Sequence, residues 1–163
     1  MSRIMEEDIK NILSADIQWE KLKSAAVLVT GASGMLGTYM LRTLAALNDS
    51  EHYDMKLYGL VRHPEKMPED LKKRVSLITQ SVSREIETDV RFDYIIHAAS
   101  PASPLIMRED PAGTIAANTL GTYYTLELAR KSNAKGYLFI SSREIYGQPY
   151  EGQREFTEDT YGF

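Results

Sequence analysis

Hydrophobic residues along the chain form two kinds of segment: continuous apolar runs and longer stretches with a helical period. Continuous runs predict strands at residues 25–29, 55–62, 74–79, 92–99 and 135–141. Runs of this kind are typical of parallel strands that are buried on both faces of a sheet. Helical spacing predicts helices at residues 5–14, 34–47 and 110–133. Strands and helices therefore alternate over most of the chain, which favours an α/β fold.

Each predicted helix has an apolar side, which in residues 5–14 consists of Met5, Ile9, Ile12 and Leu13. In the helix after Gly34, the polar residues 48–50 are expected to end the helix. Its stripe is predicted to contain Leu36, Met40, Leu44 and Leu47. The later helix begins at Asp110-Pro111, because aspartate caps free amides and proline suits a first helical turn. Its stripe is predicted to contain Ile115, Thr119, Thr122, Leu126 and Ala129.

The remaining segments have weaker patterns. Residues 69–73 have helical character, residues 80–91 are polar without an assignable pattern, and the tail after residue 141 has no predicted element. With right-handed crossovers, this order of elements predicts a doubly wound parallel sheet with the strand order 3-2-1-4-5. Ligands of such sheets bind at the carboxyl ends of the strands, where the strand order reverses.

The sequence "TGASGMLG", residues 30–37, joins the first predicted strand to a helix. Gly31 would permit a tight turn, Gly34 would let a pyrophosphate approach the backbone, and Gly37 would let the helix lie close to the sheet. The helix N-terminus would offer free amides to the phosphates. A glycine-rich turn without a ligand is the alternative, but the strand-turn-helix context favours a dinucleotide site. The predicted contacts of this turn are Gly31, Ser33, Gly34, Met35, Leu36 and Gly37.

The end of the second strand bears on which dinucleotide binds. An acidic residue there accepts hydrogen bonds from a ribose 2′-hydroxyl, whereas an arginine can meet a 2′-phosphate. Arg62 stands where an acid would be expected, and His63 and Lys66 add positive charge. The cofactor is therefore NAD or NADP, with Arg62 favouring NADP slightly. A solvated Arg62 beside bound NAD is the alternative.

Composition narrows the function. A chain of 163 residues, 43% hydrophobic and 26% charged, suffices for one globular domain with a core. The net charge of −4 gives no support for a nucleic-acid surface, and the absence of cysteine excludes disulfides and cysteine metal sites. We predict no metal site. We expect a soluble, cytoplasmic protein without a membrane partner, because the N-terminus has no apolar core and the apolar runs are short.

Four motifs, "TGASGMLG", "IIHAASPASP", "NTLGT" and "FISSREIYGQP", occur in the order and spacing of the extended short-chain dehydrogenase/reductases. Over residues 25–160 the chain resembles their NAD-dependent epimerase/dehydratase family, which includes UDP-glucuronate decarboxylases, dTDP-glucose dehydratases and UDP-sugar epimerases. The resemblance implies a Rossmann-like domain at residues 25–163 after an N-terminal helical extension at 1–24. It also implies a nucleotide-sugar substrate and a homodimeric full-length enzyme. In such enzymes the cofactor takes hydride from C4 of the sugar, and a 4-keto intermediate reacts further.

The same resemblance implies roles for single residues. Ser142 would hydrogen-bond the sugar 4-hydroxyl, because a hydroxyl group can donate or accept. Glu144 would act as the base that removes the proton beside the 4-keto group. Asn118 would support the active-site lysine. The remaining cofactor contacts would be Ala98, Ala99 and Ser100.

Each of these residues also has a structural alternative. Ser142 would satisfy backbone groups at a strand end, Glu144 would be a solvated carboxylate, and Asn118 would be a polar residue on an exposed helix face. His97, which precedes the cofactor segment, is predicted to be a packed or hydrogen-bonded residue rather than a catalyst.

The chain departs from the family pattern at two positions. Arg143 stands where dehydratases place an aspartate, and an arginine cannot serve as that acid, so dehydration is disfavoured. Ser81 replaces an aspartate that commonly touches the adenine.

The family's acid/base is a tyrosine with a lysine four residues later, and no tyrosine here has that lysine. We therefore expect the cofactor-binding portion of a longer enzyme, truncated before that pair, without the C-terminal lobe and inactive by itself. Two other functions remain open: an NADP-dependent carbonyl reductase of the same superfamily, and a non-catalytic dinucleotide-binding module.

Overall fold

A computed structural model of the chain describes residues 2–160 and 162–163. Its centre is one sheet of five parallel strands in the order β3-β2-β1-β4-β5, which confirms the predicted topology. The strands are β1 (Ala26–Thr30), β2 (Lys56–Val61), β3 (Ser76–Thr79), β4 (Tyr94–His97) and β5 (Gly136–Phe139). The order reverses between β2 and β4, on either side of β1, so the predicted ligand edge lies at the carboxyl ends of these three strands.

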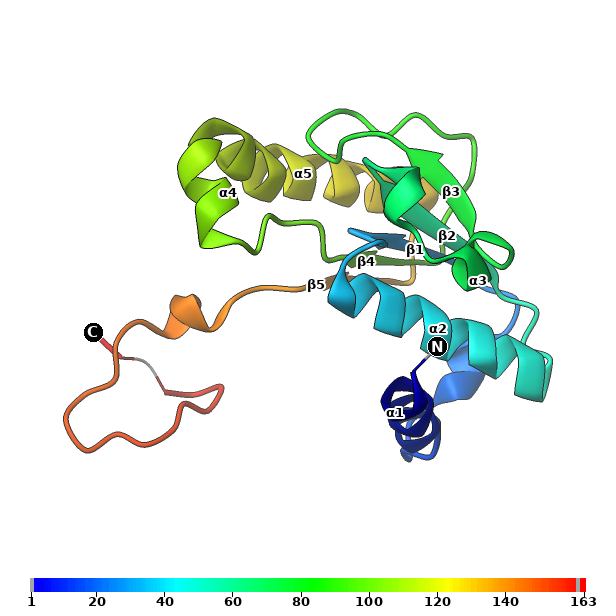
Figure 1. Ribbon diagram of the computed structural model, residues 1–163, viewed down its shortest axis with the longest axis horizontal. Helices are drawn as coiled ribbons and strands as arrows, with labels where there is room; N and C mark the ends of the chain where they lie inside the picture. Colours follow the sequence, from blue (N-terminus) through cyan, green and yellow to red (C-terminus); the bar gives the residue numbers. More distant parts are fainter. Residues whose placement is uncertain (1, 161) are drawn as a thin grey trace.

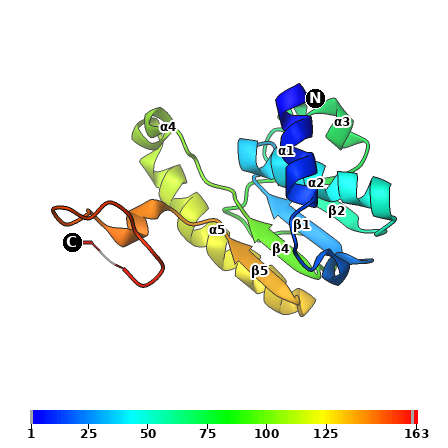
Figure 2. The ribbon, with the colours of Figure 1, turned by 90° about the horizontal axis from the view of Figure 1, so that it is seen from below.

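Helices cover both faces of the sheet (Figure 1). One face carries α2 (Met35–Glu51) and the short α3 (Glu69–Lys72), and α1 (Arg3–Leu13) lies over α2 (Figure 2). The other face carries α5 (Pro111–Ser132), which follows the short α4 (Pro104–Glu109). Three single turns of 3-10 helix complete the fold: η1 (Trp19–Leu22), η2 (Pro64–Lys66) and η3 (Arg143–Tyr146).

Strand β1 explains why its sequence is apolar without alternation. Val27 and Val29 pack into the core under α2, whereas Leu28 packs with Ile95 and Leu128 into the core under α5. Every residue of β1 is buried, because the strand lies in the middle of the sheet with a helix layer on each side. A strand in this position needs apolar side chains on both faces.

Helix α2 extends further at its C-terminal end than the sequence predicts. It continues through residues 48–50 to Glu51 and ends at His52, which has the left-handed φ of 52°. Asn48 does not stop the helix, because its side chain makes two hydrogen bonds to the backbone of Met55, at 2.9 and 3.0 Å. The predicted stripe is also partly wrong: Leu36 is exposed, and Leu41 is the fully buried residue.

The stripe predicted for α5 is mostly wrong, since only Ala129 of its residues packs against the core, although the helix itself begins and ends where the sequence indicates. Ile115 and Leu126 are exposed, and the buried face consists of Gly121, Thr125 and Leu128. A Cβ on Gly121 would lie 2.9 Å from Val82, so only glycine permits this approach without a shift. The Thr125 hydroxyl lies 2.8 Å from the hydroxyl of Tyr137. Close packing through small and polar residues therefore replaces the apolar stripe.

The segment between β3 and β4 has no helix or strand. Val82, Ile86 and Phe92 anchor it in the core under α5. The Gln80 side chain closes the loop by donating to the Glu85 carbonyl (2.9 Å) and accepting from the Glu87 amide (3.3 Å).

The segment after β5 leads away from the sheet and forms a small lobe, whose regular structure in the described part is the turn η3 (Figure 1). Helix α4 has no counterpart among the elements predicted from the sequence. Among the described residues, no helix combines the length and apolar character needed to cross a bilayer.

Candidate functional site

The glycine turn connects β1 to α2 with the geometry that the sequence predicts. Gly31 follows Thr30 with a positive φ of 66°, a conformation that favours glycine. A Cβ at Gly31 would lie 2.7 Å from the Ala98 carbonyl oxygen, so a side chain would also collide with the segment after β4. The Gly34 amide donates to the Gly31 carbonyl (2.9 Å), and Gly34 is the N-cap of α2. A Cβ on Gly37 would collide with the Gly31 backbone, so this glycine permits the tight turn and the close seat of the helix.

The N-terminus of α2 carries unpaired donors. Gly34 has no side chain to cap the helix, and the first turn contains no acidic residue. No described group accepts a hydrogen bond from the amides of Met35, Leu36 or Gly37. Free amides and the positive end of a 17-residue helix dipole together favour an anion at this position.

A cleft of about 520 Å³ opens beside this turn, at the carboxyl ends of β1, β2 and β4. Its walls come from the glycine turn, the end of β2, the loop after β3, the segment after β4 and the start of α5. It brings together seven of the predicted cofactor residues, which are Gly31, Ser33, Gly34, Arg62, Ala98, Ala99 and Ser100.

The Thr30 hydroxyl fixes the segment after β4 against this cleft. Its Oγ1 accepts from the amides of Ala98 and Ala99, each at 3.2 Å, and lies 2.8 Å from Nδ1 of His97. With both acceptor positions used, the hydroxyl proton is donated to Nδ1, so the imidazole is neutral and carries its proton on Nε2. Burial also lowers the His97 pKa, and the ring stacks on Phe139 with centroids 5.7 Å apart. His97 is thus packed and hydrogen-bonded, as the sequence indicated.

The other predicted site residues do not line the cleft. Met35 and Leu36 are exposed at the start of α2, and Gly37 is buried beneath the turn. Asn118 lies on the exposed side of α5, where its side-chain amide donates to the Thr114 carbonyl at 3.0 Å. This local hydrogen bond agrees with the alternative role given for Asn118, that of a polar residue on an exposed helix face.

Ser142 and Glu144 lie just after β5. The Ser142 hydroxyl accepts from the Glu144 amide (3.2 Å) and caps η3, while the Glu144 carboxylate lies 3.3 Å from Nε of Arg143. All three side chains are exposed. This arrangement places a hydroxyl and a carboxylate in one turn just after β5, exposed to solvent.

Sequence reasoning missed three polar residues of the cleft wall: Ser83, Arg84 and Asp110. Arg84 and Ser83 lie in the segment without a periodic pattern, so nothing local to them indicated a site. Asp110 was identified only as the cap of α5, where its Oδ1 accepts from the Gly113 amide at 2.9 Å.

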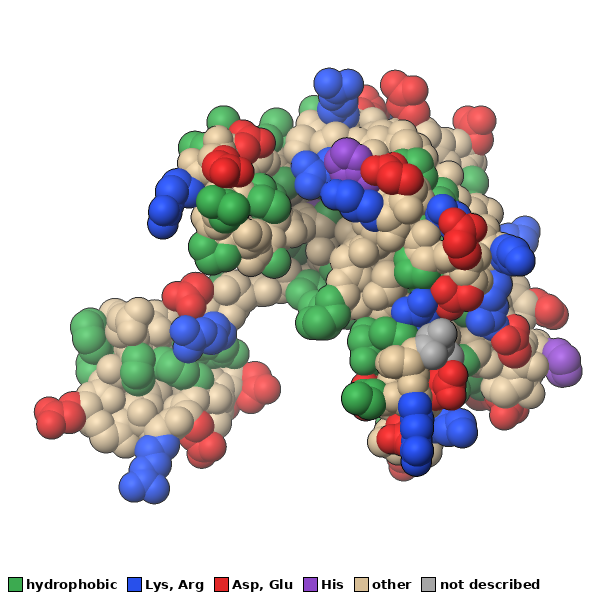
Figure 3. All heavy atoms as spheres, viewed as in Figure 1, with side chains coloured by type: hydrophobic (Ala, Val, Ile, Leu, Met, Phe, Trp, Pro, Cys, Tyr) green, Lys and Arg blue, Asp and Glu red, His purple; other side chains and the backbone are tan. Residues whose placement is uncertain are grey.

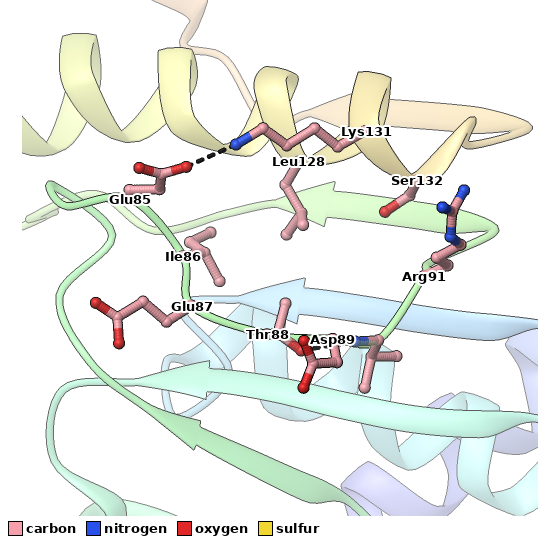
Figure 4. A pocket seen from close by; sticks show the side chains of 10 residues that line it. Glu85, Ile86, Glu87, Thr88, Asp89, Arg91, Leu128, Lys131 and Ser132 are labelled. Carbon is pink, nitrogen blue, oxygen red and sulfur yellow. Dashed lines mark hydrogen bonds and ion pairs between the residues drawn. The ribbon is translucent and has the colours of Figure 1, made fainter.

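A second hollow of about 370 Å³ lies between the loop at residues 85–91 and the C-terminal end of α5 (Figure 4). Its lining mixes both signs of charge, and an ion pair of 2.6 Å between Glu85 and Lys131 spans its edge. None of the predicted site residues lines this hollow.

The strand order and the glycine turn at the reversal point define a doubly wound, Rossmann-like domain. The sequence profile of the NAD dependent epimerase/dehydratase family matches residues 27–162. The chain belongs to this family, which confirms the resemblance drawn from the four motifs.

Curated relatives include decarboxylases. UDP-glucuronic acid decarboxylase 1 of Arabidopsis thaliana is 31% identical over 135 residues, covering 83% of this chain and 30% of the plant protein. UDP-glucuronic acid decarboxylase 1 of Danio rerio is 31% identical over 124 residues, covering 76% of this chain and 28% of that protein. The chain thus spans less than a third of the length of these two relatives.

Solved structures agree on the fold. The UDP-glucose 4-epimerase of Thermus thermophilus, solved in complex with NAD, superposes with a TM-score of 0.66 at 25% identity. The match covers 84% of this chain and 43% of the epimerase.

Proposed function

We propose that the chain is the dinucleotide-binding part of an enzyme that modifies a nucleotide-sugar through a 4-keto intermediate. The observation that carries the proposal is the glycine turn with its unpaired amides at the N-terminus of α2, inside a cleft at the reversal point of the sheet. A diphosphate suits these donors, because it is an anion that needs close approach to bare backbone. Family membership and the relatives named above support the nucleotide-sugar substrate.

NAD or NADP, when bound, would supply the acceptor for the hydride that leaves C4 of the sugar. The chain's own residues would bind and orient. The α2 amides and Ser33 would hold the diphosphate, and Ala98 to Ser100 would pass the ribose and nicotinamide side. The Ser142 hydroxyl would hydrogen-bond the sugar 4-hydroxyl, and in an epimerisation at the carbon beside the 4-keto group the Glu144 carboxylate would take the proton from that carbon.

Among the reactions that pass through a 4-keto sugar, dehydration has the least support. Arg143, which pairs with Glu144, cannot provide the acid that loss of water requires. Decarboxylation and epimerisation therefore remain as the reactions to test, and the names of the curated relatives favour the first.

The proposal extends to the setting of the enzyme. The active enzyme is a homodimer in the cytoplasm, and the 163-residue chain alone binds dinucleotide without turnover, because none of its tyrosines has a lysine four residues later. An NADP-dependent carbonyl reductase is the second candidate, supported by Arg62 at the cleft. If the 163-residue chain itself turns over a nucleotide-sugar, and Ser142→Ala removes that turnover, the prediction that this chain is inactive by itself is wrong.

A charge placed in the glycine turn tests the proposal directly. Gly34→Asp puts a carboxylate at the N-cap of α2, where it stabilises the helix but occupies the anion position. We expect the variant to melt near the temperature of the parent chain, because the gain of a cap is opposed by the 3.1 Å approach of the new Cβ to the Gly31 carbonyl oxygen. It should lose about tenfold or more in affinity for NAD and NADP. Calorimetric titration measures the affinity, and thermal denaturation measures the stability.

The matched control is Gln18→Asp, at the N-cap of η1, which also lacks a side-chain capping bond and does not line the cleft. It should bind both dinucleotides like the parent chain. If the parent chain binds neither dinucleotide, or if Gly34→Asp binds both unchanged, the cofactor assignment is wrong.

A further inference from the structure

Three cationic residues from separate segments line the same cleft. Arg62 directly follows β2, Lys66 lies in η2, and Arg84 lies in the loop after β3. All three line the same cavity as Gly31 and Gly34. Basic side chains and a histidine gather beside the hollow that α5 borders (Figure 3).

These cations have no carboxylate partner among the described residues. The ion pairs within residues 2–160 and 162–163 include none with Arg62, Lys66 or Arg84. Nearby, Glu65 pairs with His63 at 3.1 Å, so its charge is directed to that imidazole. The acidic residue that lines the cleft, Asp110, accepts from the Gly113 amide at the start of α5.

Beside these cations the cleft has no carboxylate to accept from a ribose 2′-hydroxyl, but it has further groups that can donate to a phosphate. Of the lining residues, Asp110 alone is acidic, and it belongs to the α5 wall. Ser81 and Ser83 add hydroxyl groups beside Arg84. The Ser81 hydroxyl already accepts from the Ser83 amide at 3.3 Å, which holds the two residues in one turn.

The sheet register sets the direction in which a dinucleotide would lie. Thr30, at the end of β1, is paired with Leu60 of β2, so Arg62 stands two residues beyond the level of Thr30, the residue before the glycine turn. A ligand whose diphosphate rests on the α2 amides extends its adenosine ribose toward the end of the neighbouring strand β2. The group at the ribose 2′ position is therefore the one that meets Arg62 and its neighbours.

We propose that Arg62, Lys66 and Arg84 form a binding site for the 2′-phosphate of NADP, so that the chain binds NADP in preference to NAD. The inference rests on the proposed function and adds Arg84 and Lys66 as specificity-determining residues. Guanidinium groups suit this task because they donate two parallel hydrogen bonds to phosphate oxygens. Ser83 supplies a hydroxyl donor from the same loop.

Fragments of the cofactor test this site without any need for turnover. The probes are adenosine 2′,5′-bisphosphate, its 3′,5′ isomer and adenosine 5′-monophosphate, titrated calorimetrically against the parent chain and its variants, with NAD and NADP alongside. The two bisphosphates carry the same charge, so a difference between them reports position rather than overall attraction. We expect the 2′,5′ isomer to bind about tenfold or more tightly than the other two.

Arg62→Ala and Arg84→Ala should each weaken the 2′,5′ isomer and NADP by about tenfold, the change expected from losing one charge-assisted hydrogen bond, and leave NAD unchanged. Arg91→Ala is the matched control, because Arg91 is an exposed arginine further along the same loop that does not line the cleft. It should change no affinity.

The outcomes separate this inference from the proposed function. If NAD and NADP bind equally, or if the two bisphosphates bind equally, the 2′-phosphate site is wrong while dinucleotide binding stands. The site is also wrong if Arg84→Ala lowers the affinity for NAD as much as for NADP. If no dinucleotide binds at all, the proposed function fails first.

Discussion

Some side chains at the cleft hold the fold together, whereas others have charges that remain available for a ligand. The Thr30 hydroxyl is the clearest example of the first kind. Through its bonds to Ala98, Ala99 and His97, it fixes the segment that forms one cleft wall. Buried amides without an acceptor are costly, so this hydroxyl stabilises the wall whether or not a ligand is present. Arg62 and Arg84 are the opposite case, because their charges have no described partner within the fold.

The neutral state of His97 predicts how stability depends on pH. Burial lowers its pKa below the ordinary value of 6.5, so the unfolded chain takes up a proton before the folded chain does. The stability that follows from this difference is complete above pH 6.5 and is lost as the pH falls through the folded pKa. Urea denaturation at a series of pH values should therefore show decreasing stability below pH 6.5.

His97→Asn should flatten that pH dependence, since the amide oxygen can still accept from Thr30 but does not titrate. His52→Asn is the control: His52 is exposed, and asparagine tolerates its left-handed backbone, so the slope should stay as in the parent chain. Hydrogen bonds from the Ala26 amide and Lys135 lower the pKa of Asp93 below 3.8, so this carboxylate affects stability only at more acidic pH. Equal slopes for the parent chain and His97→Asn would contradict this assignment.

At the scale of elements, the sequence predicts best where one local rule decides the structure. The continuous run of β1, the glycine turn and the Asp110-Pro111 helix start each follow from such a rule, and all three are present. The buried face of α5 was mispredicted because Gly121 is buried by a close approach to Val82 and Thr125 is buried with hydrogen bonds. The spacing of apolar residues does not reveal either kind of contact. Arg84 was missed because only the folded loop after β3 brings it to β2.

The cap of α5 gives a prediction at this scale. Asp110→Ala removes the acceptor for the Gly113 amide and leaves the N-terminus of a 22-residue helix uncapped. We expect a loss of about 1 kcal/mol in the free energy of unfolding, the usual effect of removing an aspartate cap. Urea denaturation measures it, with Asp16→Ala, an exposed aspartate outside any helix, as the control. Equal stability of the two variants would show that the cap contributes nothing.

At the scale of the whole molecule, the apolar surface is distributed unevenly. The side near α2 is covered by α1, which is tied to it by the hydrogen bond from Tyr39 to Asp8 at 3.0 Å. The opposite end is bare: β5 pairs only with β4 among the described strands, and Leu138 is 51% exposed. On α5, Ile115 is 63% exposed and Leu126 is 47% exposed. An open sheet edge beside exposed apolar side chains favours association with other chains.

We therefore expect the 163-residue chain to self-associate as its concentration rises, through the β5 edge and the exposed face of α5. Leu126→Lys combined with Leu138→Lys places charge on both surfaces and should shift the chain toward the monomer in sedimentation velocity experiments, because burying an unpaired ammonium group opposes association. Ile4→Lys combined with Ile17→Lys is the control, since both isoleucines are exposed and the pair adds the same charge elsewhere on the surface. If the two double variants associate equally strongly, the contact lies on another part of the molecule.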